Sequence, residues 1–177
     1  MKKRIIISGF GGQGVLFAGN VLGHAAMKQG WYVTLFPSYG AEMRGGTANC
    51  QITISEDPIG APVVYEPDIL IAFNKPSYEK FALKIKKDGI VLSNASLYSP
   101  KKHDNITIAQ IPANNIAEKC GSTLSLNMVM LGALAAKTQI ISIESVIDSI
   151  PEVLGDRKKA FWEVNKKAAQ AGYSYIN

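Results

Sequence analysis

A short apolar run leads directly into a glycine-rich loop near the start of the chain, and this pairing restricts the fold more than any other feature. Residues 4–8, RIIIS, form a β-branched run typical of a strand buried on both faces of a parallel sheet. The loop GFGGQGV follows at residues 9–15, and apolar residues then recur at steps of three and four through residues 13–29, which predicts a helix. A second apolar strand at residues 32–36 completes a βαβ unit.

The rest of the chain continues to alternate between predicted strands and helices. A helix is predicted after Pro76, Asn115 with Glu118 suggests a capping box at the start of another, and the last third of the chain is helical. We therefore expect one α/β domain over residues 1–177, a three-layer α/β/α sandwich around a mostly parallel, Rossmann-like sheet. The further strands are predicted at residues 47–55 and 68–73, from residue 89 and at 106–113, with a short antiparallel edge strand as an option at 56–67.

Composition removes several classes of protein. Hydrophobic residues make up 47% of the 177, an ordinary globular value, and no apolar run approaches the roughly 18 residues that span a bilayer. Cys50 and Cys120 lie far apart without a CxxC pattern, and neither His24 nor His103 has a second ligand at metal spacing. We expect a cytoplasmic protein with no metal site and no membrane segment.

The net charge of +5 raises the question of nucleic-acid binding. The basic residues form groups that fall on separate predicted helices and are interleaved with apolar residues at helical spacing. The groups are Lys84, Lys86 and Lys87, then Arg157, Lys158 and Lys159, then Lys166 and Lys167. This is the pattern of ordinary solvated faces, so we expect no nucleic-acid partner. A basic rim for an acidic small molecule or a partner subunit remains open.

The glycine loop has the chemistry of an anion site but lacks the residues of the familiar nucleotide sites. Gly9, Gly11 and Gly14 satisfy GxGxxG between a strand and a helix, and the helix start offers unpaired N–H groups and about half a positive charge. An NAD site needs an acid about 20 residues on, whereas no Asp or Glu precedes Glu42. An NADP site would place an arginine at the end of the second strand, but the first arginine after Arg4 is Arg44. A P-loop needs a lysine directly after its last glycine, and Val15 stands there instead.

Four stretches together resemble one family. GFGGQGV, PSYGAEMRGGTANCQ, FNKPSYEKF and NMVMLGALA are closely similar to the gamma subunit of 2-oxoacid:ferredoxin oxidoreductases, nearest to the 2-oxoglutarate branch. The resemblance covers nearly the whole chain. It implies a complex that oxidatively decarboxylates a 2-oxoacid to an acyl-CoA and passes electrons through iron–sulfur clusters to ferredoxin. Thiamine diphosphate then lies between the alpha and beta subunits, and the clusters lie on the beta or a small ferredoxin-like delta subunit.

For this chain, the resemblance implies a supporting role without catalytic residues. We expect it to contact coenzyme A, to hold no cofactor firmly by itself, to be inactive alone and to self-associate when isolated. For the loop around Arg44, a ligand contact and an ion pair that braces the loop are equally good interpretations, and Tyr39 is equally suited to anchoring a partner subunit. For Gly11–Gly14, contact with a phosphate or coenzyme and a tight structural turn or subunit interface are also equally good interpretations. The candidate coenzyme-binding residues are Gly11, Gly12, Gln13, Gly14, Ser38, Tyr39, Arg44, Gly45 and Gly46.

A second class of function stays open on sequence grounds. A free-standing Rossmann-like protein that binds a nucleotide or a flavin would also use a glycine loop of this kind. The missing ribose acid disfavours it. The sequence does not distinguish among 2-oxoacids, because the resemblance places the substrate contacts mainly on other subunits.

Overall fold

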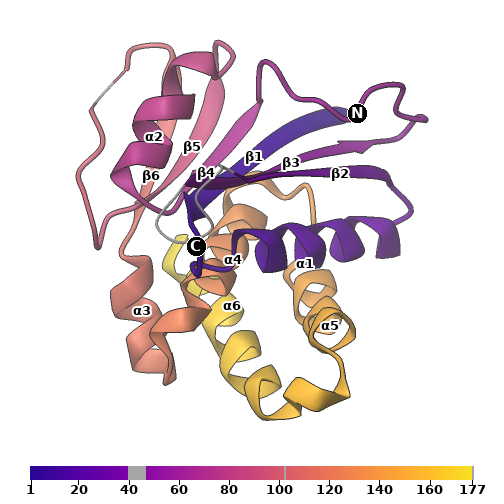
Figure 1. The fold of residues 1–177 in the computed structure, drawn as a ribbon, viewed down its shortest axis with the longest axis vertical. Helices are drawn as coiled ribbons and strands as arrows, with labels where there is room; N and C mark the ends of the chain where they lie inside the picture. The colour runs from indigo at the N-terminus through magenta and orange to yellow at the C-terminus, as the bar shows by residue number, and fades with distance from the viewer. Residues whose placement is uncertain (40–46, 102, 177) are drawn as a thin grey trace.

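The fold is built on a six-stranded mixed sheet. The computed structural model describes residues 1–39, 47–101 and 103–176, and the strand order across the sheet is β2-β3-β1-β4-β5-β6 (Figure 1). The α/β class predicted from the sequence is confirmed. The strands are β1 (Lys2–Phe10), β2 (Tyr32–Tyr39), β3 (Thr47–Ser55), β4 (Ile69–Ala72), β5 (Gly89–Asn94) and β6 (Ile106–Ile111).

The sheet contains one antiparallel strand, β3, among the described strands, and it lies second from one edge. Among the described strands, β3 alone runs against its neighbours, and it pairs with β1 on one side and with β2 on the other. Residues 56–67, the optional edge strand, form no strand, so that expectation is wrong. Pro58, Pro62 and Pro67 lack the N–H groups that a ladder needs. The segment is instead held by Val64, whose N–H donates to Gln51 Oε1 at 2.7 Å.

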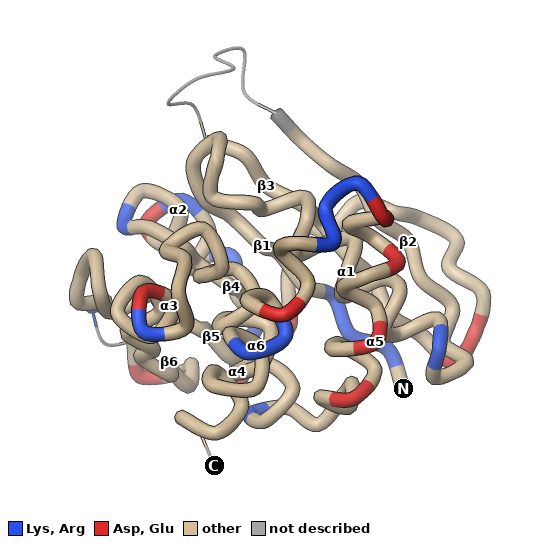
Figure 2. The backbone as a smooth tube through the Cα atoms, turned by 90° about the horizontal axis from the view of Figure 1, so that it is seen from below, with Lys and Arg blue, Asp and Glu red and all other residues tan. Residues whose placement is uncertain are grey.

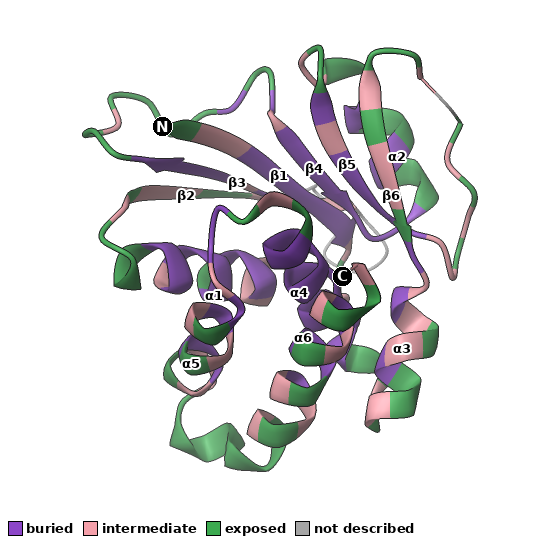
Figure 3. Ribbon diagram, turned by 180° about the vertical axis from the view of Figure 1, so that it is seen from behind, coloured by how far each residue is buried: buried purple, intermediate pink, exposed green. Residues whose placement is uncertain are grey.

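Helices cover the two faces of the sheet unequally (Figures 1 and 3). One face carries α1 and α4, with α5 and α6 packed outside them, and the core there includes Ile5 and Ile7. The other face carries α2 alone, with Ile6 and Leu70 in a smaller core. The helices are α1 (Val15–Lys28), α2 (Lys75–Phe81), α3 (Ala113–Cys120), α4 (Leu126–Thr138), α5 (Ile143–Leu154) and α6 (Trp162–Ile176), with 3-10 turns η1 (Ala82–Lys84), η2 (Thr123–Ser125) and η3 (Asp156–Phe161).

Glycines allow two close approaches within this core. A Cβ on Gly19 of α1 would lie 2.6 Å from Cys50 Sγ on β3, so the helix reaches the sheet only because that atom is missing. A Cβ on Gly132 of α4 would overlap the carbonyl of Ala169 on α6, and Gly172 faces Val129 in the same way. The backbones of α4 and α6 therefore touch directly, and α4 is almost wholly buried (Figure 3).

The predicted capping box does not form. Helix α3 begins at Ala113 with Pro112 at its N-cap position, two residues before Asn115. Asn115 therefore lies inside the first turn of the helix and cannot be its N-cap residue. The helix ends at Gly121, which has the left-handed conformation common at helix ends.

Basic and acidic residues are interspersed over the molecule (Figure 2). Lys28 pairs with Glu152 at 2.7 Å, which joins α1 to α5, and Lys86 pairs with Asp68 at 3.1 Å. Among the described helices, none combines the length and the apolar character that crossing a bilayer requires.

Candidate functional site

The glycine loop is a tight turn that requires glycine at two positions. Gly12 and Gly14 have φ values of 93° and 73°, which other residues rarely adopt. The N–H of Gln13 donates to Phe10 O at 3.1 Å, and Gly14 O accepts the first helical bond from Ala18 at 2.9 Å. The loop therefore delivers the chain from β1 into α1 within four residues.

The Gln13 side chain stabilises the loop through two hydrogen bonds. Its Oε1 accepts a hydrogen bond from Phe10 N at 2.7 Å and another from Asn74 Nδ2 at 2.9 Å. Asn74 also caps α2, because its Oδ1 accepts from Ser77 N at 2.9 Å. The amide oxygen of Gln13 is thus used structurally, while its NH2 group has no hydrogen-bond partner within the described residues.

Asn127 holds the start of α4 against the start of α1. Its Nδ2 donates to Gln13 O at 3.3 Å and to Gly14 O at 3.4 Å, and its Oδ1 accepts from Met128 N at 2.8 Å. A Cβ on Gly14 would overlap this amide. The third glycine of GxGxxG therefore serves helix-to-helix packing as well as the turn.

Two helix starts converge here, and neither N-cap residue caps its helix with its own side chain. The N-cap residues are Gly14 for α1 and Ser125 for α4, and neither helix has a side-chain cap bond or an acidic residue in its first turn. The first N–H groups of an α-helix have no partner within the helix, and each helix start carries about half a positive charge. In α4, Leu126 N already donates to Thr123 O and Met128 N to Asn127 Oδ1, so the freer N–H donors are those of α1. The junction of α1 and α4 therefore favours an anion.

A cavity of about 440 Å³ opens at this junction. Ser125 is 2% exposed and lines this cavity, and Lys158 supplies a cationic side chain from η3. Apolar side chains form much of the wall. The lining residues are Gly12, Gly14, Phe17, Ser122, Leu124, Ser125, Asn127, Val153, Leu154, Lys158, Phe161 and Asn165.

The structure brings some of the residues chosen from the sequence to this cavity and leaves others away from it. Gly12 and Gly14 line it, and Gly11 lies in the same turn. Ser38 does not: it pairs across the strands with Asn49, and Asn49 with Ser8, whose Oγ donates to Ser77 Oγ on the α2 face. Nothing is described of the Tyr39 side chain, and Arg44, Gly45 and Gly46 lie outside the described residues.

Sequence reasoning missed three residues of the site. Ser125 and Asn127 lie more than 100 residues from the loop, and Lys158 was counted among ordinary solvated lysines. The stretch NMVMLGALA contains Asn127 and supported the family resemblance, but it carried no signal of contact with the loop. Among the described residues, no group of three or more His, Cys, Asp or Glu side chains is placed to hold a metal ion.

Comparison with known proteins decides the family. Residues 4–175 match the family described as pyruvate ferredoxin/flavodoxin oxidoreductase. The chain belongs to this family. The 2-oxoglutarate synthase subunit KorC of Methanocaldococcus jannaschii is 40% identical over 160 residues, which cover 86% of each protein. The ketoisovalerate oxidoreductase subunit VorA of Methanothermobacter marburgensis is 38% identical over 170 residues, 96% of this chain and 35% of VorA.

Solved structures agree with this assignment. The gamma subunit of a keto/oxoacid ferredoxin oxidoreductase from Geobacter sulfurreducens matches with a TM-score of 0.88 and 28% identity, over 99% of this chain and 97% of that one. A 2-oxoglutarate:ferredoxin oxidoreductase from Magnetococcus marinus, with 2-oxoglutarate, coenzyme A and succinyl-CoA bound, matches with a TM-score of 0.89 and 25% identity. That match covers 99% of this chain.

The likeness to a gamma subunit predicted from the sequence is therefore confirmed. The chain spans about a third of the VorA relative and 31% of the Magnetococcus chain, whereas it spans nearly all of the Geobacter gamma subunit. The homologues are named as subunits of oxidoreductases, which favours the subunit interpretation over a free-standing nucleotide-binding protein.

Proposed function

We propose that this chain is the gamma subunit of a thiamine-diphosphate-dependent 2-oxoacid:ferredoxin oxidoreductase and that its glycine-loop cavity binds coenzyme A. The observation that carries this proposal is the junction of the starts of α1 and α4 beside Lys158 and an apolar wall, with no side-chain cap on α1. Following the family resemblance, we assign thiamine diphosphate to the alpha and beta subunits, and the clusters to the beta or ferredoxin-like subunit. Ferredoxin is then the electron acceptor of the complex.

The cavity suits both halves of coenzyme A. The diphosphate needs hydrogen-bond donors and positive charge, which the start of α1, the Ser125 hydroxyl and Lys158 can supply. The adenine and the pantetheine arm need apolar surface, which Phe17, Leu124 and Leu154 can provide. The bound coenzyme A named for the Magnetococcus enzyme supports this choice of ligand.

Among 2-oxoacids we favour 2-oxoglutarate. KorC, at 40% identity over most of both chains, is named for 2-oxoglutarate, and the Magnetococcus structure contains it. VorA, at 38% identity, is named for ketoisovalerate. Comparing kcat/KM for 2-oxoglutarate, pyruvate and ketoisovalerate in the assembled complex tests this choice, and a higher value for either alternative would overturn it.

The test of the coenzyme A site uses the reconstituted complex. Charge-assisted hydrogen bonds are worth roughly 1.5–3 kcal/mol, so Lys158→Ala should raise the KM for coenzyme A about tenfold or more and leave the KM for the 2-oxoacid unchanged. Lys167→Ala, an exposed lysine on α6 outside the cavity, is the matched control. An unchanged coenzyme A value in a fully assembled Lys158→Ala complex would contradict the proposal.

Arg44 and the glycines beside it remain part of the proposed contact surface. Arg44→Ala should weaken coenzyme A by about tenfold or more for the same reason. Gly12→Val should act similarly by blocking the approach of a ligand to the loop, since Gly12 lines the cavity. Because Gly12 has a φ of 93°, this variant is compared only as an assembled complex in which the loop still folds. If Arg44→Ala instead prevents assembly and leaves coenzyme A binding unchanged, the loop braces an interface.

The chain alone should show no turnover with 2-oxoglutarate, coenzyme A, thiamine diphosphate and a viologen dye. Steady turnover without the other subunits would contradict its proposed role as a non-catalytic subunit.

A further inference from the structure

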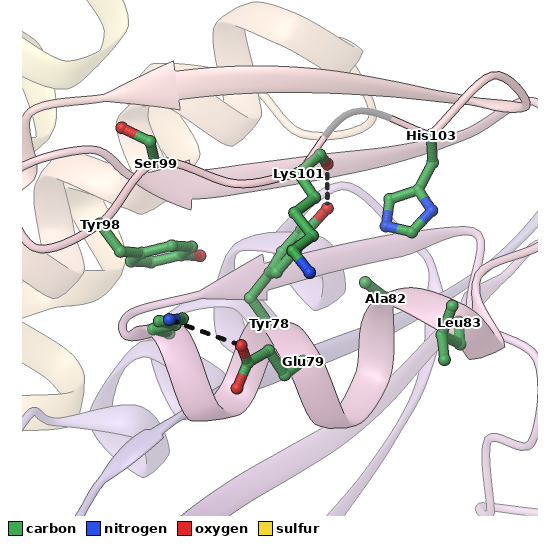
Figure 4. Close-up of a pocket in the computed structure, with 9 residues that line it drawn as sticks. Tyr78, Glu79, Ala82, Leu83, Tyr98, Ser99, Lys101 and His103 are labelled. Atoms are coloured by element: carbon green, nitrogen blue, oxygen red, sulfur yellow. Dashed lines mark hydrogen bonds and ion pairs between the residues drawn. The ribbon is translucent and has the colours of Figure 1, made fainter.

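A second cavity, of about 400 Å³, lies between α2 with η1 and the connection from β5 to β6 (Figure 4). It belongs to the α2 face of the sheet, and it shares no lining residue with the glycine-loop cavity. Its lining residues are Lys75, Tyr78, Glu79, Ala82, Leu83, Tyr98, Ser99, Lys101 and His103.

Aromatic rings dominate the inner wall. The Tyr78 ring lies 5.7 Å from the Tyr98 ring at 45° and 6.2 Å from the His103 ring at 49°. Tyr78 is 4% exposed, and its hydroxyl donates to Lys101 O at 2.6 Å, which ties the β5–β6 connection to α2. The rings are therefore held in place before any ligand arrives, and rings of this kind favour tilted or offset contact with another aromatic ring.

The charge at the mouth favours an anion. The Lys101 ammonium points into the space between the two elements (Figure 4) and has no ion-pair partner among the described residues. Lys75 stands 3.8 Å from Glu79 in an exposed pair, a geometry that adds little stability and leaves the lysine available. Ser99 also lines the cavity, but its hydroxyl points away from Lys101 in Figure 4, so the two lysines carry the attraction for an anion.

We propose that this cavity binds a small aromatic acid, meaning a planar ring that carries one anionic group. The ring lies against Tyr78 and Tyr98, and the anionic group lies at the mouth beside Lys101 and Lys75. Ligand pockets span about 300–1,000 Å³, and this cavity is at the small end of that range, which suits one or two fused rings. Glu79, also at the mouth, disfavours ligands with several negative charges.

The test uses the isotope-labelled full chain and indole-3-acetate as the probe. Titration followed by NMR should move the backbone signals of Glu79, Ser99 and His103 in a saturable way, with little movement at the glycine loop. Indole alone should bind more weakly because it lacks the anion, and acetate alone should not saturate. Saturation by acetate, or shifts centred elsewhere, would overturn the proposal.

Variants of Lys101 test whether indole-3-acetate binds at this cavity rather than elsewhere on the surface. Exposed ion pairs are worth up to about 1 kcal/mol, so Lys101→Ala should weaken indole-3-acetate about threefold to fivefold. Lys101→Arg should keep most of the affinity, and Lys167→Ala on α6 should change nothing. Lys101 is exposed, so its replacement does not threaten folding. Equal binding by Lys101→Ala, or binding of an aromatic acidic peptide without binding of the free acid, would refute the site.

Discussion

The Asn74 side chain donates a hydrogen bond of 2.9 Å to Gln13 Oε1, and this contact joins the start of α2 to the glycine loop on the other side of β1. Asn74 caps α2 with its oxygen at the same time. The loop, the helix cap and the end of β1 therefore share one hydrogen-bond network. Because Gln13 Oε1 also accepts from Phe10 N, losing that oxygen leaves two donors without a partner.

Gln13→Ala should lower the free energy of unfolding by about 1–3 kcal/mol, because unpaired buried donors carry their full desolvation cost. Urea unfolding of the chain measures this. Gln13→Glu keeps an acceptor oxygen at the same position and should lose less. Equal stability of Gln13→Ala and the wild type would mean that the network does not support the loop.

Gly14→Ala should be more destabilising than Gly30→Ala. Both glycines have positive φ, 73° and 83°, and the left-handed conformation costs other residues roughly 1–2 kcal/mol. Gly30 has open space around it, whereas a Cβ on Gly14 would overlap Asn127. Thermal or urea unfolding of the two variants compares the costs directly. If both variants lose the same stability, Asn127 does not hold α4 tightly against the loop.

Gly132→Ala should destabilise the chain by about 1–3 kcal/mol or more, the typical cost of overfilling a packed core. The added methyl group would overlap the Ala169 carbonyl, and a backbone cannot move aside as a flexible side chain can. Gly60→Ala, in open space and without a positive φ, is the control and should change stability little. Calorimetry on the two variants distinguishes these outcomes.

The two cysteines should differ sharply in reactivity. Burial raises the pKa of the Cys50 thiol to about 12, while Cys120 is half-buried. A thiol reagent at pH 8 should therefore modify Cys120 first and reach Cys50 only in denaturant, because the thiolate is the reactive form. Rapid modification of Cys50 in the native protein would show that α1 does not stay packed on β3.

Cys50 also makes the stability of the protein depend on pH. Its folded-state pKa lies above the unfolded value, so its contribution is fully present below the ordinary thiol range and is lost progressively as the pH rises from that range toward about 12. Urea unfolding of wild type and Cys50→Ala at several pH values between about 7 and 10 isolates this contribution. The wild type should lose stability with rising pH relative to the variant. Parallel curves for the two proteins would contradict it.

The sequence by itself determined the local elements and the family. The RIIIS run, the GFGGQGV loop and the TANCQITIS alternation each appear as the predicted strand, turn or strand, because β-branched residues and glycines act through their own backbones. The predicted helix at residues 13–29 became α1 at Val15–Lys28, since Gly14 is held in the left-handed conformation that ends the turn. These preferences need no distant partner.

Only the tertiary structure decided where β3 lies and what surrounds the loop. The placement of β3 between β1 and β2 depends on strand pairing that local periodicity does not specify. The glycine-loop cavity is lined in part by Ser125, Asn127 and Lys158. These distant segments come together because α4 packs on the sheet and the backbones of α4 and α6 touch at Gly132 and Gly172. A polar side chain far along the chain acquires its role from that packing, and no local pattern of residues encodes it.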